Sequence, residues 1–141
     1  METDAAGNIW LAMDEDTSAG AKSALICFNQ SLNLVKALPQ SSYGHHISQL
    51  CMDKNLGRML YADNDLYSVN VSDTALPSSA FVSKGSKNIY ALGVDEQTGD
   101  VYVSDALDFV QRCRVYRYDK FGKEIHSFTA GIISGNFTFN E

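Results

Sequence analysis

The sequence predicts an all-β fold built from repeated units of about four short strands. In the clearest unit Val101, Val103 and Val115 alternate with Tyr102, Tyr116 and Tyr118, and this period-2 pattern of β-branched and aromatic residues is typical of strands. Turn glycines recur at Gly7, Gly57 and Gly99, at intervals of 50 and 42 residues. A repeat of roughly 40–50 residues with about four strands per unit is the spacing of β-propeller blades. The sequence therefore favours a partial β-propeller of about three four-stranded antiparallel blades.

The clearest unit spans residues 89–129. Its four expected strands are Ile89–Asp95, Asp100–Ser104, Arg114–Asp119 and Ile125–Thr129. Gly99 and Gly122 stand in the hairpin connections, where glycine can adopt the positive φ that a tight turn demands.

The first unit spans approximately residues 4–38 and is expected to be incomplete. Strands are predicted around Ile9–Ala12, Ala24–Phe28 and Leu34–Ala37, but no inner strand is expected ahead of Asp4. The segment from Asp4 to Ala12 therefore aligns with the middle of the unit at 89–129.

The second unit spans approximately residues 46–84. Its expected strands are Gln49–Asp53, Arg58–Ala62, Asp65–Asn70 and Ala80–Ser83. Its aromatic residue Tyr61 comes one position later, relative to the turn glycine, than Trp10 and Tyr102 do in their units. On this evidence the repeat is imperfect.

Residues 136–140 are expected to form a closing strand, because Phe137 and Phe139 alternate around Thr138. A terminal strand commonly completes the blade at the other end of a ring of blades. Since propellers have about 4–8 blades, we expect a fragment or a subunit of a larger ring. Its terminal blade faces would then be exposed and open to self-association.

Composition excludes several classes of partner. The formal net charge is −6, and the 11 Lys and Arg residues are scattered, so no basic stripe is present to bind nucleic acid. No apolar run approaches the roughly 20 residues that cross a bilayer, and no signal peptide is evident at the start. Three cysteines cannot all pair within one chain, and small buried hydrophobic roles are expected for them.

The ligand face is predicted on loops that leave one end of the blades, since connections in a four-strand meander alternate between its two ends. These loops span residues 14–23, 39–48, 85–88 and 105–112. Loops on a rigid scaffold usually carry function. The candidate ligand-binding residues are Tyr43, His45, His46, Asp105, Asp108, Phe109 and Gln111.

Two loop motifs could bind a metal. His45 and His46 could ligate an ion or move protons, but neighbouring strand residues point to opposite faces, and surface or structural roles are expected. The acidic run at 14–16 lacks the Gly and Glu that an EF-hand requires in register, and a solvated loop is expected there. We therefore expect no metal site and no cofactor.

The loop after the second strand of the last unit combines two carboxylates with an aromatic ring. Asp105, Asp108 and Phe109 suit a sugar or the edge of a planar cofactor. Turn capping explains the two aspartates equally well.

Two segments, residues 94–109 and 114–128, carry a resemblance to known repeats. They resemble the YVTN/NHL-like propeller repeats, and more closely a family of poorly characterised surface propellers of gut anaerobic bacteria that are typically exported lipoproteins. The matching residues are Asp95, Thr98 to Asp105, Tyr116 to Asp119, Gly122, Gly131 and Phe137 to Phe139. The chain departs from that pattern at Ile132 to Ser134, where many members have Pro after the closing Gly, and it lacks the upstream signal peptide and lipid-anchoring Cys.

The resemblance implies the C-terminal part of a cell-surface or periplasmic propeller that binds a ligand. Some relatives bind corrinoids for import, and others accompany glycan uptake. Because no catalytic motif is present, the sequence predicts non-catalytic binding of a glycan, corrinoid or other small molecule. The alternatives are a scaffold for protein–protein interaction and a metal-dependent lactonase or lyase.

Overall fold

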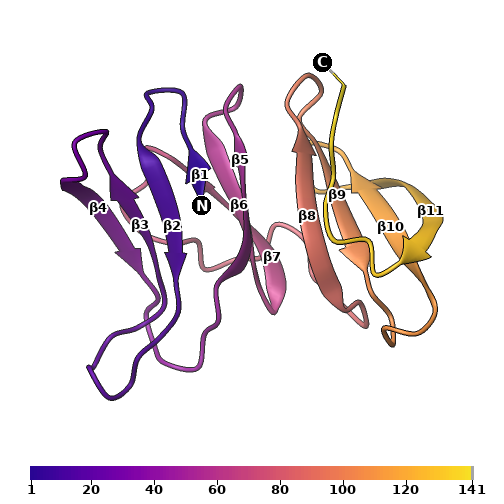
Figure 1. The fold of residues 1–141 in the computed structure, drawn as a ribbon, viewed down its shortest axis with the longest axis horizontal. Coiled ribbons are helices and arrows are strands. Elements are labelled where there is room, and N and C mark those ends of the chain that lie inside the picture. Colours follow the sequence, from indigo (N-terminus) through magenta and orange to yellow (C-terminus); the bar gives the residue numbers. More distant parts are fainter. Residues whose placement is uncertain (141) are drawn as a thin grey trace.

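The computed structural model describes residues 1–140, which form eleven strands in three antiparallel sheets (Figure 1). The first sheet contains β1 (Glu2–Thr3), β2 (Ile9–Met13), β3 (Ala24–Phe28) and β4 (Leu34–Pro39). The second contains β5 (Ser48–Asp53), β6 (Arg58–Asp63) and β7 (Asp65–Asn70). The third contains β8 (Ile89–Asp95), β9 (Asp100–Asp105), β10 (Arg112–Tyr118) and β11 (Glu124–Ile132).

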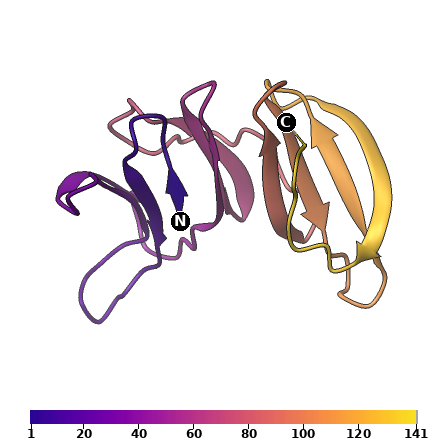
Figure 2. The same cartoon turned by 45° about the horizontal axis from the view of Figure 1, so that its top comes forward.

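The sheets stand in a row in chain order, and consecutive strands are neighbours within each sheet (Figures 1 and 2). No helix occurs within residues 1–140, so none there could cross a membrane. This arrangement confirms the predicted all-β fold with blade-like sheets.

The first sheet has an inner strand that was not predicted from the sequence. In β1, Glu2 pairs with Trp10 and Thr3 pairs with Ile9. The prediction that no strand precedes Asp4 was therefore wrong. A two-residue strand is too short to show the alternation by which strands are recognised.

The second sheet has three strands, and the predicted strand Ala80–Ser83 does not form. Only an isolated bridge joins Leu66 to Val82. Phe81 instead packs against the core between the second and third sheets, with its ring 5.4 Å from the Arg58 guanidinium and its carbonyl beside Gly122.

Residues 136–140 do not form the predicted closing strand. They run alongside β8 and β9 over the outward face of the third sheet (Figure 1). The rings of Phe137 and Phe139 lie 6.0 and 5.2 Å from that of Tyr102. Gly93 leaves room for Phe137, whose Cβ would be 2.7 Å from a Cβ built on that glycine. Packing against a sheet face has replaced pairing with a sheet edge.

Two apolar interfaces hold the three sheets together. Between the first and second sheets lie Trp10, Leu25, Cys27, Leu38, Ile47, Met52, Met59, Tyr61 and Val69. Between the second and third lie Leu60, Leu66, Val94, Val101, Val103 and Tyr118. All six residues of β6 are buried, because successive side chains of a strand point to opposite faces and both faces of this strand are covered.

The repeat is regular once residues are counted from the turn glycine. Gly7, Gly57 and Gly99 all have positive φ, at 80°, 61° and 76°, as predicted for the turn positions. Three residues after each glycine come Trp10, Leu60 and Tyr102. Trp10 and Leu60 face the next sheet in chain order, and Tyr102 faces the C-terminal segment on the corresponding side. Tyr61 corresponds instead to Leu11 and Val103. The apparent slip of the aromatic residue is therefore a change of residue type within an unchanged register.

A buried arginine joins the second sheet to the third. Arg58 donates from Nε to Asp53 Oδ2 at 3.1 Å, and from its two terminal nitrogens to the carbonyls of Lys120 and Gly99 at 2.8 and 2.9 Å. Asp53 is 0% exposed. Because the guanidinium carries several donors in fixed directions, it fixes the position of one sheet relative to the next.

Candidate functional site

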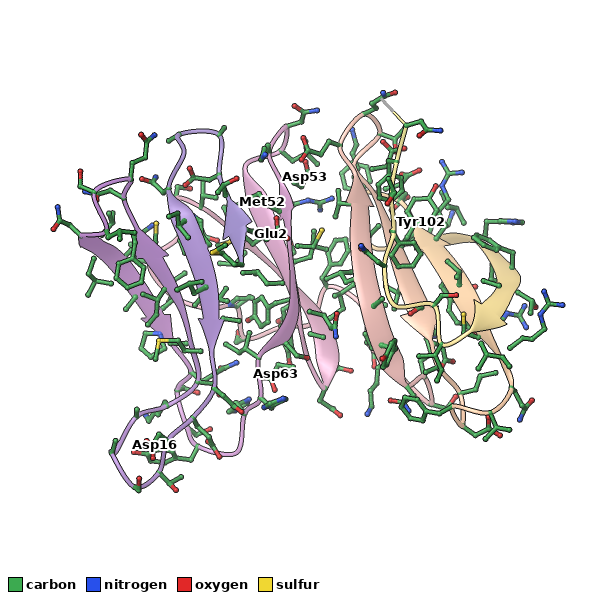
Figure 3. All side chains as sticks on the ribbon, in the orientation of Figure 1. Glu2, Asp16, Met52, Asp53, Asp63 and Tyr102 are labelled. Carbon is green, nitrogen blue, oxygen red and sulfur yellow. The ribbon has the colours of Figure 1, made fainter. Side chains whose placement is uncertain are left out.

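The loops that follow β2, β4 and β9 leave the same end of the sheets, the lower end in Figure 1. Asp16 and Asp63 lie at that end in Figure 3. This agrees with the alternation on which the predicted ligand face was based. The loops fall into two groups, one at the first and second sheets and one at the third.

In the first group, the loop after β2 is hydrogen-bonded to the loop after β4. Glu15 Oε2 accepts from the backbone amide of Gly44 at 2.8 Å. The ammonium of Lys22 donates to the Ser41 carbonyl at 2.6 Å and lies 5.7 Å from the ring of Tyr43. These contacts fix the backbone around the predicted site residues.

His46 and Asp14 form an exposed pair, with Nδ1 and Oδ1 2.8 Å apart. The hydrogen bond from His46 lowers the pKa of Asp14. Tyr43 is 48% exposed. Tyr43 and His46 thus lie on the outside of the loop.

His45 points inward and meets Asp63, which is 7% exposed. Its Nδ1 lies 2.7 Å from Asp63 Oδ2. The same carboxylate accepts from Gln40 Nε2 at 2.8 Å and from the backbone amide of His46 at 3.0 Å. Asp63 therefore fixes both the His45 ring and the chain between the first two sheets.

A cavity of about 330 Å³ lies beside His45. Its walls combine apolar side chains, an aromatic ring and hydrogen-bonding groups. The lining residues are Pro39, Gln40, Ser41, His45, Tyr67, Ala75, Leu76, Pro77 and Ser78. The ring of Tyr67 is itself held in place, since it stacks on Tyr61 with 5.4 Å between centroids.

In the second group, the candidate residues bond mainly within their own loop. Asp108 accepts from the backbone amide and side chain of Gln111, at 2.9 and 2.8 Å. These hydrogen bonds, with one from Val110, lower the pKa of Asp108 to about 2. Asp105, 3% exposed, accepts from the amides of Asn88 and Leu107. Turn capping thus accounts for both aspartates.

Phe109 is the exposed aromatic residue of this second group, at 46% exposure. Its ring meets that of Tyr90 edge-on, with 5.8 Å between centroids. Within residues 1–140 no hydrogen bond or ring contact joins this group to His45 and the cavity. Of the seven predicted site residues, only His45 lines the cavity.

Gln40, Asp63 and Tyr67 also belong to the site but are not among the residues predicted from the sequence. A signal for Asp63 was available, because Asp63 and Asp105 both stand six residues after their turn glycines. Each accepts a backbone amide from the connection that enters its sheet, donated by His46 and Asn88 respectively. The cavity itself had no such signal, since residues 75–78 reach it from a loop without a repeated pattern.

The described residues contain no group of three or more His, Cys, Asp or Glu side chains arranged to bind a metal ion. The three cysteines are free thiols. Burial raises the pKa of Cys51 to about 12, so its reactive thiolate form is scarce at neutral pH.

No protein family and no curated protein matches the sequence. Among solved structures, the chain is similar to a quinoprotein alcohol dehydrogenase-like protein from Bacteroides thetaiotaomicron, with a TM-score of 0.69 and 16% sequence identity. The match covers 89% of this chain and 32% of that one, so the chain spans about a third of the length of its structural neighbour. The fold is that of a partial β-propeller.

Proposed function

We propose that this chain is the ligand-binding part of a β-propeller and that its ligand occupies the cavity beside His45. The observation that carries the proposal is the lining of this cavity. Ligand sites are concave and largely apolar with a few fixed polar groups. Here the rings of Pro39 and Pro77 accompany Leu76, while Gln40 and His45 are held by Asp63.

The cavity favours a small uncharged ligand. Its volume of about 330 Å³ is at the lower end of the range for ligand pockets, roughly 300–1,000 Å³. A single sugar unit fits that volume, with a Tyr67 ring for its apolar face and amide and imidazole groups for its hydroxyls. A corrinoid is far larger. We therefore favour the glycan alternative over the corrinoid one.

The proposed setting is the surface of a bacterial cell. It is supported by the resemblance of residues 94–109 and 114–128 to repeats of exported lipoproteins. In this setting the cavity would capture a nutrient for uptake.

Filling the cavity tests the proposal. Ala75 is an exposed lining residue, so Ala75→Trp would occupy the space without removing a buried contact. The matched control is Ala19→Trp, at an exposed alanine of the loop after β2. In calorimetric titrations with a panel of neutral mono- and disaccharides, we expect saturable binding by wild type and control, and at least about tenfold weaker binding by Ala75→Trp. Equal binding by both variants, or no binding of any sugar by wild type, would contradict the proposal.

A protein-interaction scaffold is the second candidate, favoured by the outward face of the first sheet. Side chains on that face alternate with the buried Trp10 and Cys27 and are apolar; they include Ile9, Leu11, Met13, Ile26 and Phe28. An uncovered sheet face of this kind is typical of a protein interface. Concentration-dependent association in sedimentation velocity, abolished by Leu11→Lys, would support this candidate.

A further inference from the structure

We infer that Ser42, His45 and Asp63 form an acyl-transfer triad, in which His45 lines the cavity. Ser42 Oγ lies 3.2 Å from His45 Nε2, and His45 Nδ1 lies 2.7 Å from Asp63 Oδ2. A hydroxyl, an imidazole and a buried carboxylate joined in this order are the parts of a serine nucleophile and its base. The inference goes beyond ligand binding, although it uses the same cavity.

The hydrogen bonds assign a role to each nitrogen of His45. An ionised carboxylate only accepts hydrogen bonds, so Nδ1 donates its proton to Asp63. Nε2 then presents its lone pair to the hydroxyl of Ser42, as a general base requires. Asp63 is 7% exposed and is also held by Gln40 and the His46 amide, so it is a positioning residue for the ring.

Backbone donors lie next to the nucleophile. Within residues 1–140, the amides of Ser42 and Tyr43 donate to no other group. The amide of the nucleophile itself is a common donor to the oxyanion of acyl transfer. The Lys22 ammonium, 2.6 Å from the carbonyl of Ser41, adds positive charge beside this loop.

The reaction that fits these groups is ester hydrolysis. Ser42 Oγ attacks the carbonyl carbon while its proton passes to His45 Nε2, and a tetrahedral oxyanion forms. The bond from carbon to the alkoxy oxygen then breaks, and the alcohol leaves with the proton from His45. Water attacks the acyl-serine with His45 as base, which releases the carboxylic acid and restores the Ser42 hydroxyl.

The substrate class follows from the cavity and from the charges nearby. The apolar wall formed by Pro39, Leu76 and Pro77 suits the acyl chain of a short ester. Asp14 and Glu15 stand on the adjacent loop and disfavour an anionic substrate. We therefore assign small neutral carboxylic esters as substrates.

Hydrolysis of p-nitrophenyl butyrate and labelling by a fluorophosphonate probe, located by mass spectrometry, test the inference. We expect the probe on Ser42, and a rate that falls about 100-fold or more in Ser42→Ala, since general base and nucleophile act together. The matched control is Ser31→Ala, at an exposed turn between β3 and β4 that does not line the cavity, and it should keep the wild-type rate. Equal rates in wild type and Ser42→Ala, or a probe that labels no residue or another serine, would overturn the inference.

A sugar titration of Ser42→Ala separates this inference from the proposed binding function. Intact binding by a variant that has lost hydrolysis supports both. Sugar binding by a wild-type protein that neither hydrolyses the ester nor takes the probe overturns the triad alone. Asp63→Asn adds a test of positioning: we expect a lower maximal rate with continued labelling at Ser42, and an unchanged rate would overturn the role of Asp63.

Discussion

The two ends of the array differ in how their outward faces are covered, although their strands occupy equivalent places in the repeat. On the third sheet, the outward-facing Ala91, Ser104, Cys113 and Val115 are at most 2% exposed. On the first sheet, no other segment of residues 1–140 covers the outward face (Figures 1 and 2), and Met13 is 43% exposed. Burial at either end is therefore set by what lies opposite the sheet.

The cover of the third sheet is its own C-terminal segment. The hydroxyl of Ser104 donates to the carbonyl of Ser134 at 2.7 Å, and Cys113 Sγ lies 3.0 Å from Ser134 Oγ. Phe137 and Phe139 pack on Tyr102, whose equivalents Trp10 and Leu60 face a neighbouring sheet. Residues 134–139 thus take the place of a sheet at this end.

The largest contrast is expected from a charge placed on each outward face. Val115→Asp puts an unpaired carboxylate at a position that is 1% exposed, and we expect it to lower the free energy of unfolding by about 3 kcal/mol or more. Leu11→Asp, on the uncovered face of the first sheet, should cost about 1 kcal/mol or less. Urea denaturation measures both. Equal losses would contradict the contrast between the two ends.

Removing the Phe137 ring should expose the outward face of the third sheet. Phe137→Ala deletes a half-buried ring that packs on Tyr102 and over Gly93, and we expect a loss of about 2 kcal/mol. Cys113, now 0% exposed, should react faster with Ellman's reagent. Phe121→Ala, at a ring that is 79% exposed, is the control and should change neither quantity. A thiol that stays unreactive in Phe137→Ala would show that the segment does not cover this face.

A smaller effect on the free energy of unfolding is expected when acid protonates Asp4, which lies between β1 and β2. Burial alone raises the pKa of Asp4, but hydrogen bonds from Trp10, Asn8 and Ala6 outweigh it and hold the pKa below its ordinary value of 3.8. The stabilisation is therefore present above about pH 4 and is lost as the pH falls through the lowered value. We expect Asp4→Asn to remove about 1 kcal/mol at pH 7 and to show a weaker loss of stability in acid. If the stability of Asp4→Asn falls with pH in parallel with that of wild type, Asp4 is excluded as a cause of the acid destabilisation.

Local patterns predicted the strands of the third sheet well, because Val101, Val103 and their partners alternate within a hairpin whose turn glycine is unambiguous. The failures involve segments whose partners are distant. Residues 80–83 and 136–140 have strand-like alternation. Residues 80–83 make only one bridge to β7, and Phe81 packs in the core between two sheets, while residues 136–140 pack on the outward face of the third sheet. Alternation shows that a segment has two faces, but not whether its backbone finds an edge to pair with.

The candidate site could be predicted only in part, because its residues also depend on partners that are distant in the sequence. His45 could be selected from sequence because it stands in a loop at the predicted ligand end of the blades, where loops on a rigid scaffold usually carry function. Its role depends on Asp63, 18 residues later, and on a cavity wall at residues 75–78. Those contacts arise from the packing of the first sheet against the second, which no local pattern encodes.

Amide hydrogen exchange, followed residue by residue in the wild-type protein, tests most directly the claim that each sheet is protected by what covers it. Exchange reports local opening, which is rarest where a strand is buried on both faces. Among the strands that pair with a neighbour on both sides, we predict the slowest exchange in β6, intermediate rates in β9 and β10, and the fastest in β2 and β3. If β2 and β3 exchange as slowly as β6, the outward face of the first sheet is covered in solution and the contrast between the two ends is wrong.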